Sequence, residues 1–357
     1  MPIKEIVQQI QSRKKAKSKL QHWHKIPGVI FPTSDYLEQS SSEKTAELKA
    51  SSIKGKSLVD LTGGTGADSY FFSRKFERVV YVEPNEELFN LAKHNFHQLE
   101  VDNVKFSNST AEDYLEKAGQ THDWFYIDPS RRKDGQRVYQ LRDCQPDVLQ
   151  ILPKILATGA KVLLKLSPLL DIHLAQNQLE SVSKVTVVSV NNDCKELLFQ
   201  LEAQPGRIAF EAVNITNDEV LRFDFRAGEE DEASANHSVP INYLYEPNAS
   251  VLKLGAFKLI AKKFDLFKLH PNTHLYTSKD LVTEFPGRIF KIKSFEAFNW
   301  KSLKRGKIKM ANITTRNFQH SVETIRKRTG INDGGEGYLF FARTAEENLL
   351  TISCQKV

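Results

Sequence analysis

The segment that decides the fold is Leu58-Val59-Asp60-Leu61-Thr62-Gly63-Gly64-Thr65-Gly66-Ala67-Asp68. A short apolar run leads to Asp60, a glycine-rich turn follows at once, and residues 67–76 predict a helix. Strand, glycine-rich turn and helix in this order are typical of the start of a nucleotide-binding βαβ unit, where bare backbone must approach a ligand closely. We therefore expect an α/β fold that binds a ligand at this turn.

Two classes of cofactor use such a turn. A dinucleotide site favours three glycines spaced G-x-G-x-x-G, but here Ser69 stands where the third glycine would be. An acid, Asp60, also ends the strand before the turn, and a second acid, Glu83, follows the next predicted strand at 78–82. A pyrophosphate gains nothing from the first acid, whereas S-adenosylmethionine (SAM) carries an amino group and a sulfonium. The two acids together favour SAM, with Glu83 placed to accept the ribose hydroxyls.

Helices and strands alternate along the chain as far as residue 205. We expect strands near 57–60, 78–82, 104–106, 124–127 and 161–166, with helices between them, and then two strands at 185–190 and 196–204. This alternation predicts a Rossmann-like parallel sheet with right-handed crossovers. Its last two strands are expected to form an antiparallel hairpin at the edge of a seven-stranded sheet.

In open α/β sheets the ligand lies at the carboxyl ends of the strands. The residues at those ends and in the first turn are therefore the candidates for holding SAM: Asp60, Thr62, Gly64, Gly66, Glu83, Ser109, Thr110 and Asp128. Lys165 ends the fifth strand inside an apolar run. A buried unpaired ammonium is costly, so we expect it to reach the rim of the site or to pair with an acid such as Asp128.

From these motifs the chain resembles the class I SAM-dependent methyltransferases. Asp128-Pro129-Ser130-Arg131 is similar to the D/N-P-P-x motif of methyltransferases that modify nucleic-acid bases, with Ser130 in place of the second proline. The resemblance implies that the acid and a following backbone carbonyl hold the target amine. It makes four residues the catalytic candidates: Asp128, Pro129, Ser130 and Lys165.

A narrower resemblance covers most of the chain from about residue 20. The segments that carry it are Asp128–Arg132, Arg142–Asp147, Lys165–Pro168, Tyr245–Ala249 and Thr315–Asn317. Together they resemble a bacterial family of methyltransferases with a ferredoxin-like insert and a C-terminal THUMP-like domain. Since THUMP domains bind RNA, the resemblance implies RNA as the partner.

Two chemical outcomes remain open at this site. Methylation of a base amine needs the nitrogen lone pair aligned with the methyl group and a partner for the departing proton, which Asp128 can supply. Methylation at a pyrimidine C5 needs a cysteine nucleophile, and Cys144 is the candidate near this edge. Five cations in the same loop suit a phosphate-bearing substrate or pair with nearby acids: Arg131, Arg132, Lys133, Arg137 and Arg142.

Composition and charge limit the classes of function. The net charge is +6, and residues 1–30 and 286–357 carry local charges of +6 and +8 around an acidic middle. Basic ends suit a polyanion, and the run 301–309 has Phe298 and Trp300 beside it, as in many RNA-binding surfaces. Three scattered cysteines favour a reducing cytoplasm and no structural zinc. We therefore expect no metal as partner. No apolar run reaches membrane-spanning length, so we expect no membrane as partner either.

At 357 residues the chain is expected to form several domains. We expect an N-terminal helical segment at 1–52, a SAM-dependent methyltransferase domain at 53–205, a ferredoxin-like α+β domain at 206–286 and a THUMP-like domain at 287–357. The leading hypothesis is a SAM-dependent methyltransferase acting on a base in tRNA or rRNA. The alternatives are a small-molecule or protein methyltransferase, and a non-catalytic RNA-binding protein that keeps the SAM fold.

Overall fold

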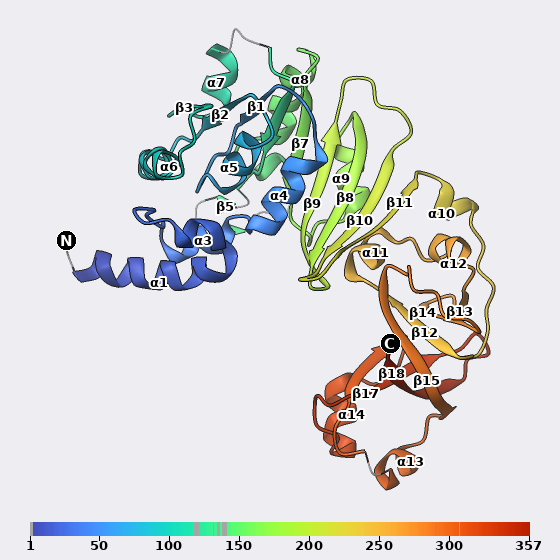
Figure 1. Cartoon of the computed structure of the whole chain (residues 1–357). Helices are drawn as coiled ribbons and strands as arrows, with labels where there is room; N and C mark the ends of the chain where they lie inside the picture. The colour runs from blue at the N-terminus through green and yellow to red at the C-terminus, as the bar shows by residue number, and fades with distance from the viewer. Residues whose placement is uncertain (1–2, 118–120, 131, 134–135, 138–140, 307) are drawn as a thin grey trace. The chain divides into compact units, whose positions relative to one another are not determined.

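The computed structural model describes the whole chain except residues 1–2, 118–120, 131, 134–135, 138–140 and 307. The chain divides into two compact units. Unit 1 contains residues 1–188 and 195–208, and unit 2 contains residues 189–194 and 209–357. Each unit is described by itself below (Figure 1).

Unit 1 contains the parallel sheet that the sequence predicts. Its strands are β1 (Ser57–Asp60), β2 (Arg78–Val82), β3 (Val104–Ser107), β4 (Trp124–Ile127), β7 (Lys161–Leu166), β8 (Val182–Val190) and β9 (Asp193–Leu201). From β3 the order runs β3-β2-β1-β4-β7-β9-β8. The pairs β1–β2, β2–β3, β1–β4 and β4–β7 are parallel, and β7–β9 is antiparallel. Strands β1 and β4 are buried along their whole length and β7 along most of it, as expected for a parallel sheet covered by helices on both faces.

One expectation about this sheet is wrong. It has nine strands rather than seven, because β10 (Ala209–Ile215) and β11 (Val220–Arg226) follow β8 in the strand order. The hairpin of β8 and β9 is therefore not the edge of the sheet. The alternation of side chains within a strand indicates which face is buried, but it does not indicate whether another strand pairs with its backbone.

Helices join the parallel strands and pack around them (Figure 1). They are α5 (Ala67–Ser73), α6 (Glu86–Gln98), α7 (Ala111–Lys117), α8 (Val148–Leu156) and α9 (Ile172–Gln178), with a 3-10 turn at Leu141–Asp143. Side-chain oxygens of Asn85, Asp147 and Asp171 accept the first free N–H groups of α6, α8 and α9. These caps explain why the three helices begin where they do. A short hairpin, β5 (Arg132–Lys133) with β6 (Gln136–Arg137), follows β4.

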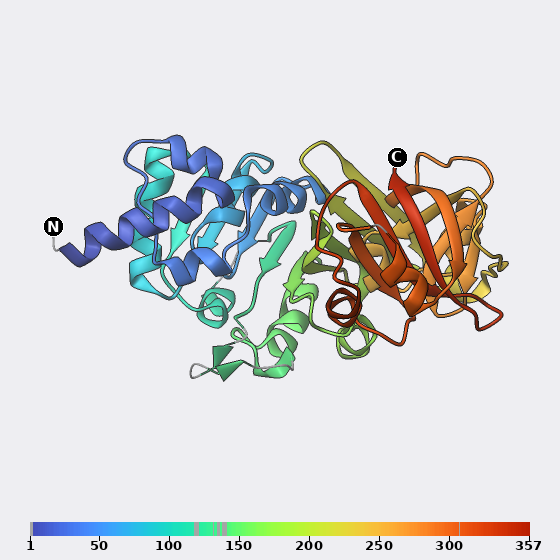
Figure 2. The ribbon, with the colours of Figure 1, turned by 90° about the horizontal axis from the view of Figure 1, so that it is seen from below.

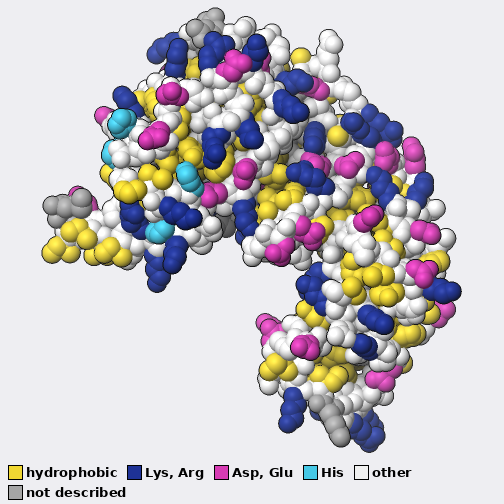
Figure 3. Space-filling view, in the orientation of Figure 1, with side chains coloured by type: hydrophobic (Ala, Val, Ile, Leu, Met, Phe, Trp, Pro, Cys, Tyr) yellow, Lys and Arg dark blue, Asp and Glu magenta, His cyan; other side chains and the backbone are white. Residues whose placement is uncertain are grey.

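Four helices precede the sheet: α1 (Ile3–Lys19), α2 (Gln21–Lys25), α3 (Ser34–Gln39) and α4 (Glu43–Ser52). The segment around Trp23 is helical, and Trp23 is fully buried. Helix α1 packs through Ser12 and Ala16, and its N-terminal half projects from unit 1 in two views (Figures 1 and 2). That half exposes an apolar stripe, visible at the N-terminal end in Figure 3: Ile3, Ile6, Val7 and Ile10.

Unit 2 is built on a second sheet of seven strands. In order these are β13 (Phe267–His270), β14 (Thr273–Ser278), β12 (Tyr243–Pro247), β15 (Gly287–Ala297), β18 (Leu349–Lys356), β17 (Gly337–Arg343) and β16 (Asn312–Arg316). Its helices are α10 (Glu229–Glu232), α11 (Ala249–Leu254), α12 (Leu259–Lys263), α13 (Trp300–Arg305) and α14 (Val322–Thr329). A core of Leu244, Leu269, Phe290, Phe340 and Ile352 is shared by strands before and after residue 287. The boundaries proposed for the individual domains stay a prediction.

Candidate active site

Four charged residues lie at the carboxyl ends of neighbouring strands in unit 1. Asp60 ends β1, Glu83 and Asp128 directly follow β2 and β4, and Lys165 is the penultimate residue of β7. Because these strands are parallel and adjacent, their carboxyl ends meet at one edge of the sheet. The structure thus brings together the acids and the lysine that the sequence selected.

Asp60 is almost completely buried, with 1% of its surface exposed. Its Oδ1 accepts a hydrogen bond from the backbone N–H of Thr62 at 3.0 Å, and its Oδ2 accepts one from Ser69 Oγ at 2.5 Å. Burial raises the pKa of Asp60 to about 7, and the carboxylates of Asp68 and Asp128 act in the same direction, against the two hydrogen bonds. The carboxyl group is held in place, but its charge is poorly compensated.

The glycine-rich turn has two conformational requirements. Gly64 has φ +53 and Gly66 has φ +84, both in the left-handed region. A Cβ on Gly66 would lie 2.8 Å from the ring of Phe96, so this glycine also lets α5 pack against α6. The backbone groups of Gly64 are used within the turn, since its N–H donates to Glu83 Oε2 at 2.8 Å and its carbonyl accepts from Tyr81 Oη at 2.7 Å.

Glu83 is anchored from both sides. Besides Gly64, its other oxygen accepts the backbone N–H of Asn85 at 2.9 Å, and Asn108 Nδ2 donates to its backbone carbonyl at 2.8 Å. Burial raises the pKa of Glu83, and the two backbone hydrogen bonds partly offset that effect. An ionised carboxylate can accept about four hydrogen bonds, so capacity remains for the hydroxyls of a ligand.

The other two cofactor candidates, Ser109 and Thr110, have local partners. Ser109 Oγ lies 2.9 Å from Ser107 Oγ, and Thr110 Oγ1 accepts the backbone N–H of Asp113 at 3.0 Å. Thr110 therefore stabilises the first turn of α7. A cofactor role for these two residues stays a prediction.

Asp128 is fixed by residues from two other strand ends. Its backbone N–H donates to Thr62 Oγ1 at 2.7 Å, and Lys165 Nζ forms an ion pair with its Oδ2. Burial alone would lower the pKa of Lys165, but the nearby carboxylates of Asp128, Glu196 and Asp68 outweigh burial and raise it. Lys165 therefore stays protonated at neutral pH and pairs with Asp128, as the sequence predicted.

The two residues after Asp128 differ in exposure. Pro129 is buried and Ser130 is exposed. Ser130 forms a two-way backbone bridge with Gln145, with N–H to O distances of 2.8 and 3.0 Å. This bridge brings the chain next to Cys144 close to the motif, although Cys144 itself is buried, with 6% of its surface exposed.

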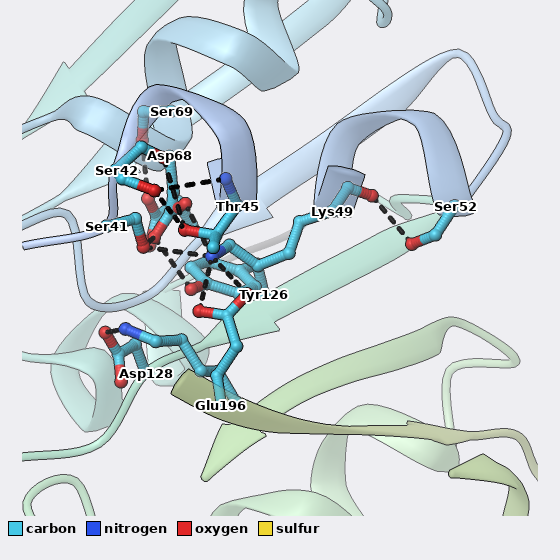
Figure 4. Close-up of polar contacts among 12 residues, drawn as sticks. Ser41, Ser42, Thr45, Lys49, Ser52, Asp68, Ser69, Tyr126, Asp128 and Glu196 are labelled. Carbon is cyan, nitrogen blue, oxygen red and sulfur yellow. Dashed lines mark hydrogen bonds and ion pairs between the residues drawn. The ribbon is translucent and has the colours of Figure 1, made fainter. Parts of the chain in front are cut away.

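Behind these strand ends lies a buried network that the sequence did not reveal (Figure 4). Lys49 Nζ of α4 lies 3.0 and 2.9 Å from the two carboxylate oxygens of Glu196 in β9 and 3.1 Å from Asp68 Oδ1. The other oxygen of Asp68 accepts hydrogen bonds from Ser41 Oγ and Tyr126 Oη, each at 2.8 Å. Asp68 follows the glycine-rich turn and Tyr126 lies two residues before Asp128. The network therefore connects an N-terminal helix to both halves of the site.

Sequence signals for this network exist but are weak. Asp68 belongs to the quoted turn, and Glu196 is an acid at the start of the apolar run 196–201. Nothing in the sequence around Lys49 distinguishes it from the exposed lysines of other helices. Partners separated by 147 positions can be paired only once the fold is known.

The site fits a cationic cofactor. Asp60 is buried beside two other carboxylates that raise its pKa, and the groups that lower it are hydrogen-bond donors rather than cations. A ligand that brings a positive charge would supply the missing compensation, and the sulfonium and amino groups of SAM both do so. Asp60 would hold that cationic part, and Glu83 would hold the ribose.

Two further points concern the surroundings of the site. Within the described ranges, no group of three or more His, Cys, Asp or Glu side chains could hold a metal ion. Among the basic residues expected in the loop after β4, Arg142 is described and exposed. The side chains of Arg131, Arg132, Lys133 and Arg137 lie outside the described part of the chain, as does Lys307 of the C-terminal basic run.

Three family models match the chain. One, described as "Conserved hypothetical protein 95", matches residues 30–167. A ferredoxin-like domain model matches residues 243–286, and a THUMP domain-like model matches residues 287–356. The expected ferredoxin-like and THUMP-like parts of the chain are thereby confirmed.

A solved structure matches the whole chain. It is described as a "putative methyltransferase from Porphyromonas gingivalis W83", and it shares 32% sequence identity with a TM-score of 0.92. The match covers 100% of this chain and 92% of that one. The expected fold class, a Rossmann-like methyltransferase sheet with further α+β structure, is confirmed apart from the number of strands.

Two curated relatives match part of the chain. Both are described as 23S rRNA (uracil(747)-C(5))-methyltransferase RlmC, from Vibrio vulnificus strains CMCP6 and YJ016. The first is 29% identical over 123 residues, and the second is 28% identical over 137 residues. The matched region spans 33% and 36% of this chain, and about a third of the length of each relative.

Proposed function

This chain belongs to the same family as the Porphyromonas gingivalis protein, and from that premise we propose that it is a SAM-dependent methyltransferase that modifies a base in RNA. The observation that carries the proposal is the position of Asp128. Its backbone is tied to Thr62 in the cofactor turn, and its side chain is paired with Lys165. Asp128 is thus fixed beside the residues that would hold SAM.

The chemistry follows from that position. SAM, when bound, supplies an electrophilic methyl group. Asp128 would accept a hydrogen bond from the target amine through Oδ1, because Oδ2 is held by Lys165, and would thereby orient the nitrogen lone pair. The same carboxylate can receive the amine proton that the reaction releases. Asp128, Pro129, Ser130 and Lys165 remain the proposed catalytic set.

RNA is proposed as the substrate on three grounds. The residues of Asp128-Pro129-Ser130-Arg131 resemble a motif of base-modifying methyltransferases, a THUMP domain-like model matches residues 287–356, and the partial relatives are described as rRNA methyltransferases. We propose tRNA or rRNA as the RNA class. The proposed location is the cytoplasm, which the three free cysteines support. Among the described residues, no helix is long and apolar enough to span a membrane.

A second candidate reaction is methylation of a pyrimidine C5. The bridge between Ser130 and Gln145 favours it, because Cys144 precedes the residue that pairs with the motif. The thiol would have to become accessible from its buried position to attack a base. We therefore place amine methylation first. A small-molecule or protein substrate is the remaining alternative, and RNA binding that weakens with salt would argue against it.

The decisive experiment is a comparison of modified nucleosides. RNA from a strain that lacks this gene is digested, and its nucleosides are compared with those of the parent by mass spectrometry. Loss of one methylated nucleoside, restored by the parent protein but not by Asp128→Ala, is the expected result. An unchanged nucleoside profile, together with methyl transfer to a small molecule or protein in extracts, would contradict the proposal.

A further inference from the structure

Two sequence segments that the proposed reaction leaves unexplained meet in unit 2. They are Tyr245–Ala249 and Thr315–Asn317, and an ion pair joins them: Arg316 Nη2 donates to Glu246 Oε1 at 2.8 Å. Glu246 lies on β12 and Arg316 ends β16, and three other strands lie between them in the sheet order. The sheet must therefore curl to bring the two residues together, and the contact is specific to this fold.

A second arginine binds the same carboxylate. Arg288 lies directly opposite Glu246 in the antiparallel pair of β12 and β15, so the two side chains share one face of the sheet. Its Nε donates to Glu246 Oε2 at 2.7 Å, and its Nη2 donates to the same oxygen. The carboxylate of Glu246 is thus held by one arginine on each oxygen.

The buried acid and the two arginines differ in their exposure to solvent. Only 2% of the Glu246 side chain is exposed, compared with 39% for Arg288 and 37% for Arg316. A single arginine would be enough to compensate one buried carboxylate. The second arginine leaves a net charge of +1 at a place where both arginine side chains are partly exposed. In addition, Arg316 Nε is a buried donor with no hydrogen-bond partner among the described residues.

The surroundings keep this charge positive and hold Arg316 in place. Burial, together with the positive charges of Lys268 and Arg316, lowers the pKa of His274 to about 4, so His274 is neutral at pH 7. The next residue, Asn317, donates through Nδ2 to His270 Nδ1 at 3.1 Å. His270 Nε2 in turn lies 3.0 Å from Glu347 Oε1. Arg316 is therefore anchored by its neighbour in the chain as well as by Glu246.

We propose that Glu246 fixes Arg288 and Arg316 as a binding site for a phosphate group of RNA. The planar guanidinium presents several N–H donors in a fork that matches phosphate oxygens. Two guanidinium groups that one buried acid already holds lose little conformational freedom when they bind a phosphate, which favours a preformed anion site. This inference rests on the proposed RNA substrate and adds a contact in unit 2.

The test uses the full chain and unfractionated tRNA in a filter-binding series from about 50 to 200 mM salt. Arg316→Gln should weaken binding about tenfold and reduce the slope of log affinity against log salt by about one, because one phosphate contact is lost. Arg316→Lys should keep the slope but bind several-fold more weakly than the parent, since charge is kept and the fork is lost. Lys327→Gln, on an exposed face of α14, is the matched control for a lost positive charge.

The proposal is overturned if Arg316→Gln behaves like Lys327→Gln in both affinity and slope. Thermal unfolding of each variant, together with retained binding of SAM, shows that the chain is folded. An RNA oligonucleotide with and without a 5′-phosphate then identifies the phosphate: equal binding indicates an internal phosphodiester, and dependence on the 5′-phosphate indicates a terminal one. Arginine-dependent binding of a phosphopeptide but of no RNA would also overturn the proposal.

The outcomes separate this inference from the proposed reaction. If the parent binds tRNA through Arg316 but methylates no RNA, the reaction is wrong and the phosphate site stands. If the parent methylates RNA and Arg316→Gln does so with an unchanged KM, the phosphate site is wrong and the reaction stands.

Discussion

The ammonium of Lys49 lies 2.9 Å from Oε2 of Glu196, and both side chains are almost completely shielded from water, with 0% and 3% of their surfaces exposed. The same ammonium lies 3.1 Å from Asp68 Oδ1. One cation therefore compensates two buried acids that belong to different elements. Removing it would leave both acids in a low-dielectric environment with only hydrogen bonds and the more distant Lys165 to support them.

Lys49→Met should therefore lower the free energy of unfolding by roughly 3–5 kcal/mol, the usual cost of breaking a buried ion pair from one side. Urea unfolding at pH 7 measures this change, and Lys154→Met on the exposed face of α8 is the control. The double variant Lys49→Met with Glu196→Gln should recover part of the loss, because one uncompensated charge is removed. If Lys49→Met is as stable as the control Lys154→Met, the prediction is contradicted.

Asp60 should make the affinity for SAM depend on pH. Its pKa is raised to about 7 by burial and by nearby acids, and a cationic ligand favours the ionised form. Affinity should therefore rise as the pH increases towards 7 and level off above it, approaching tenfold per pH unit on the acid side. Calorimetry of SAM binding between pH 5.5 and about 8.5 measures this profile.

The control is Asp60→Asn, which should bind SAM more weakly and show a flat profile over the same range.

Without ligand, the folding stability should depend on pH in the opposite direction to the SAM affinity. A carboxyl group whose folded pKa lies above its unfolded value loses stability as the pH rises from about 4 to about 7, because the folded state binds more protons there. A parent profile as flat as that of Asp60→Asn would show that Asp60 does not meet the cationic part of SAM.

Glu83→Ala should weaken SAM binding by roughly 1–3 kcal/mol, because hydrogen bonds from the ribose hydroxyls to a carboxylate are lost. Glu83 also accepts the N–H groups of Gly64 and Asn85, so part of the effect could arise from the loop itself. Glu83→Gln separates the two causes, since it keeps an acceptor oxygen and the shape of the side chain. Calorimetry should give an intermediate affinity for Glu83→Gln, and equal affinities for parent and alanine variant would contradict the ribose role.

The parts of the fold that sequence predicts well are those set by local pattern. Strands β2, β4 and β7 have the predicted bounds, because apolar runs of the right length end at charged or turn-forming residues. The segment 248–264 is not one continuous helix. It divides into α11 and α12 at Gly255, whose φ of +76 ends the first helix. Strand β16 was missed, because its segment Asn312–Arg316 is polar and only partly buried.

The candidate site likewise has residues that the sequence predicts and pairings that it does not. The acids at the strand ends could be found because parallel strands must present their carboxyl ends together. The pairing of Lys165 with Asp128 followed from the cost of a buried ammonium. By contrast, the partners of Lys49 and of Glu246 depend on which distant elements the fold places side by side, and neither pairing leaves a local pattern in the sequence.

The last prediction concerns the reaction itself. Asp128→Ala should abolish methyl transfer while leaving SAM affinity within a few-fold, because Asp128 would contact the substrate amine. The fold should survive, since Lys165 also interacts with the nearby carboxylates of Glu196 and Asp68, which would still compensate its charge. Cys144→Ala should retain appreciable activity if the target is an amine. The assay is transfer of a labelled methyl group from SAM to RNA extracted from the deletion strain. Complete loss of activity in Cys144→Ala, with a covalent protein–RNA adduct trapped in the parent, would instead assign the reaction to a pyrimidine C5, because attack by a thiolate is the step that this chemistry requires.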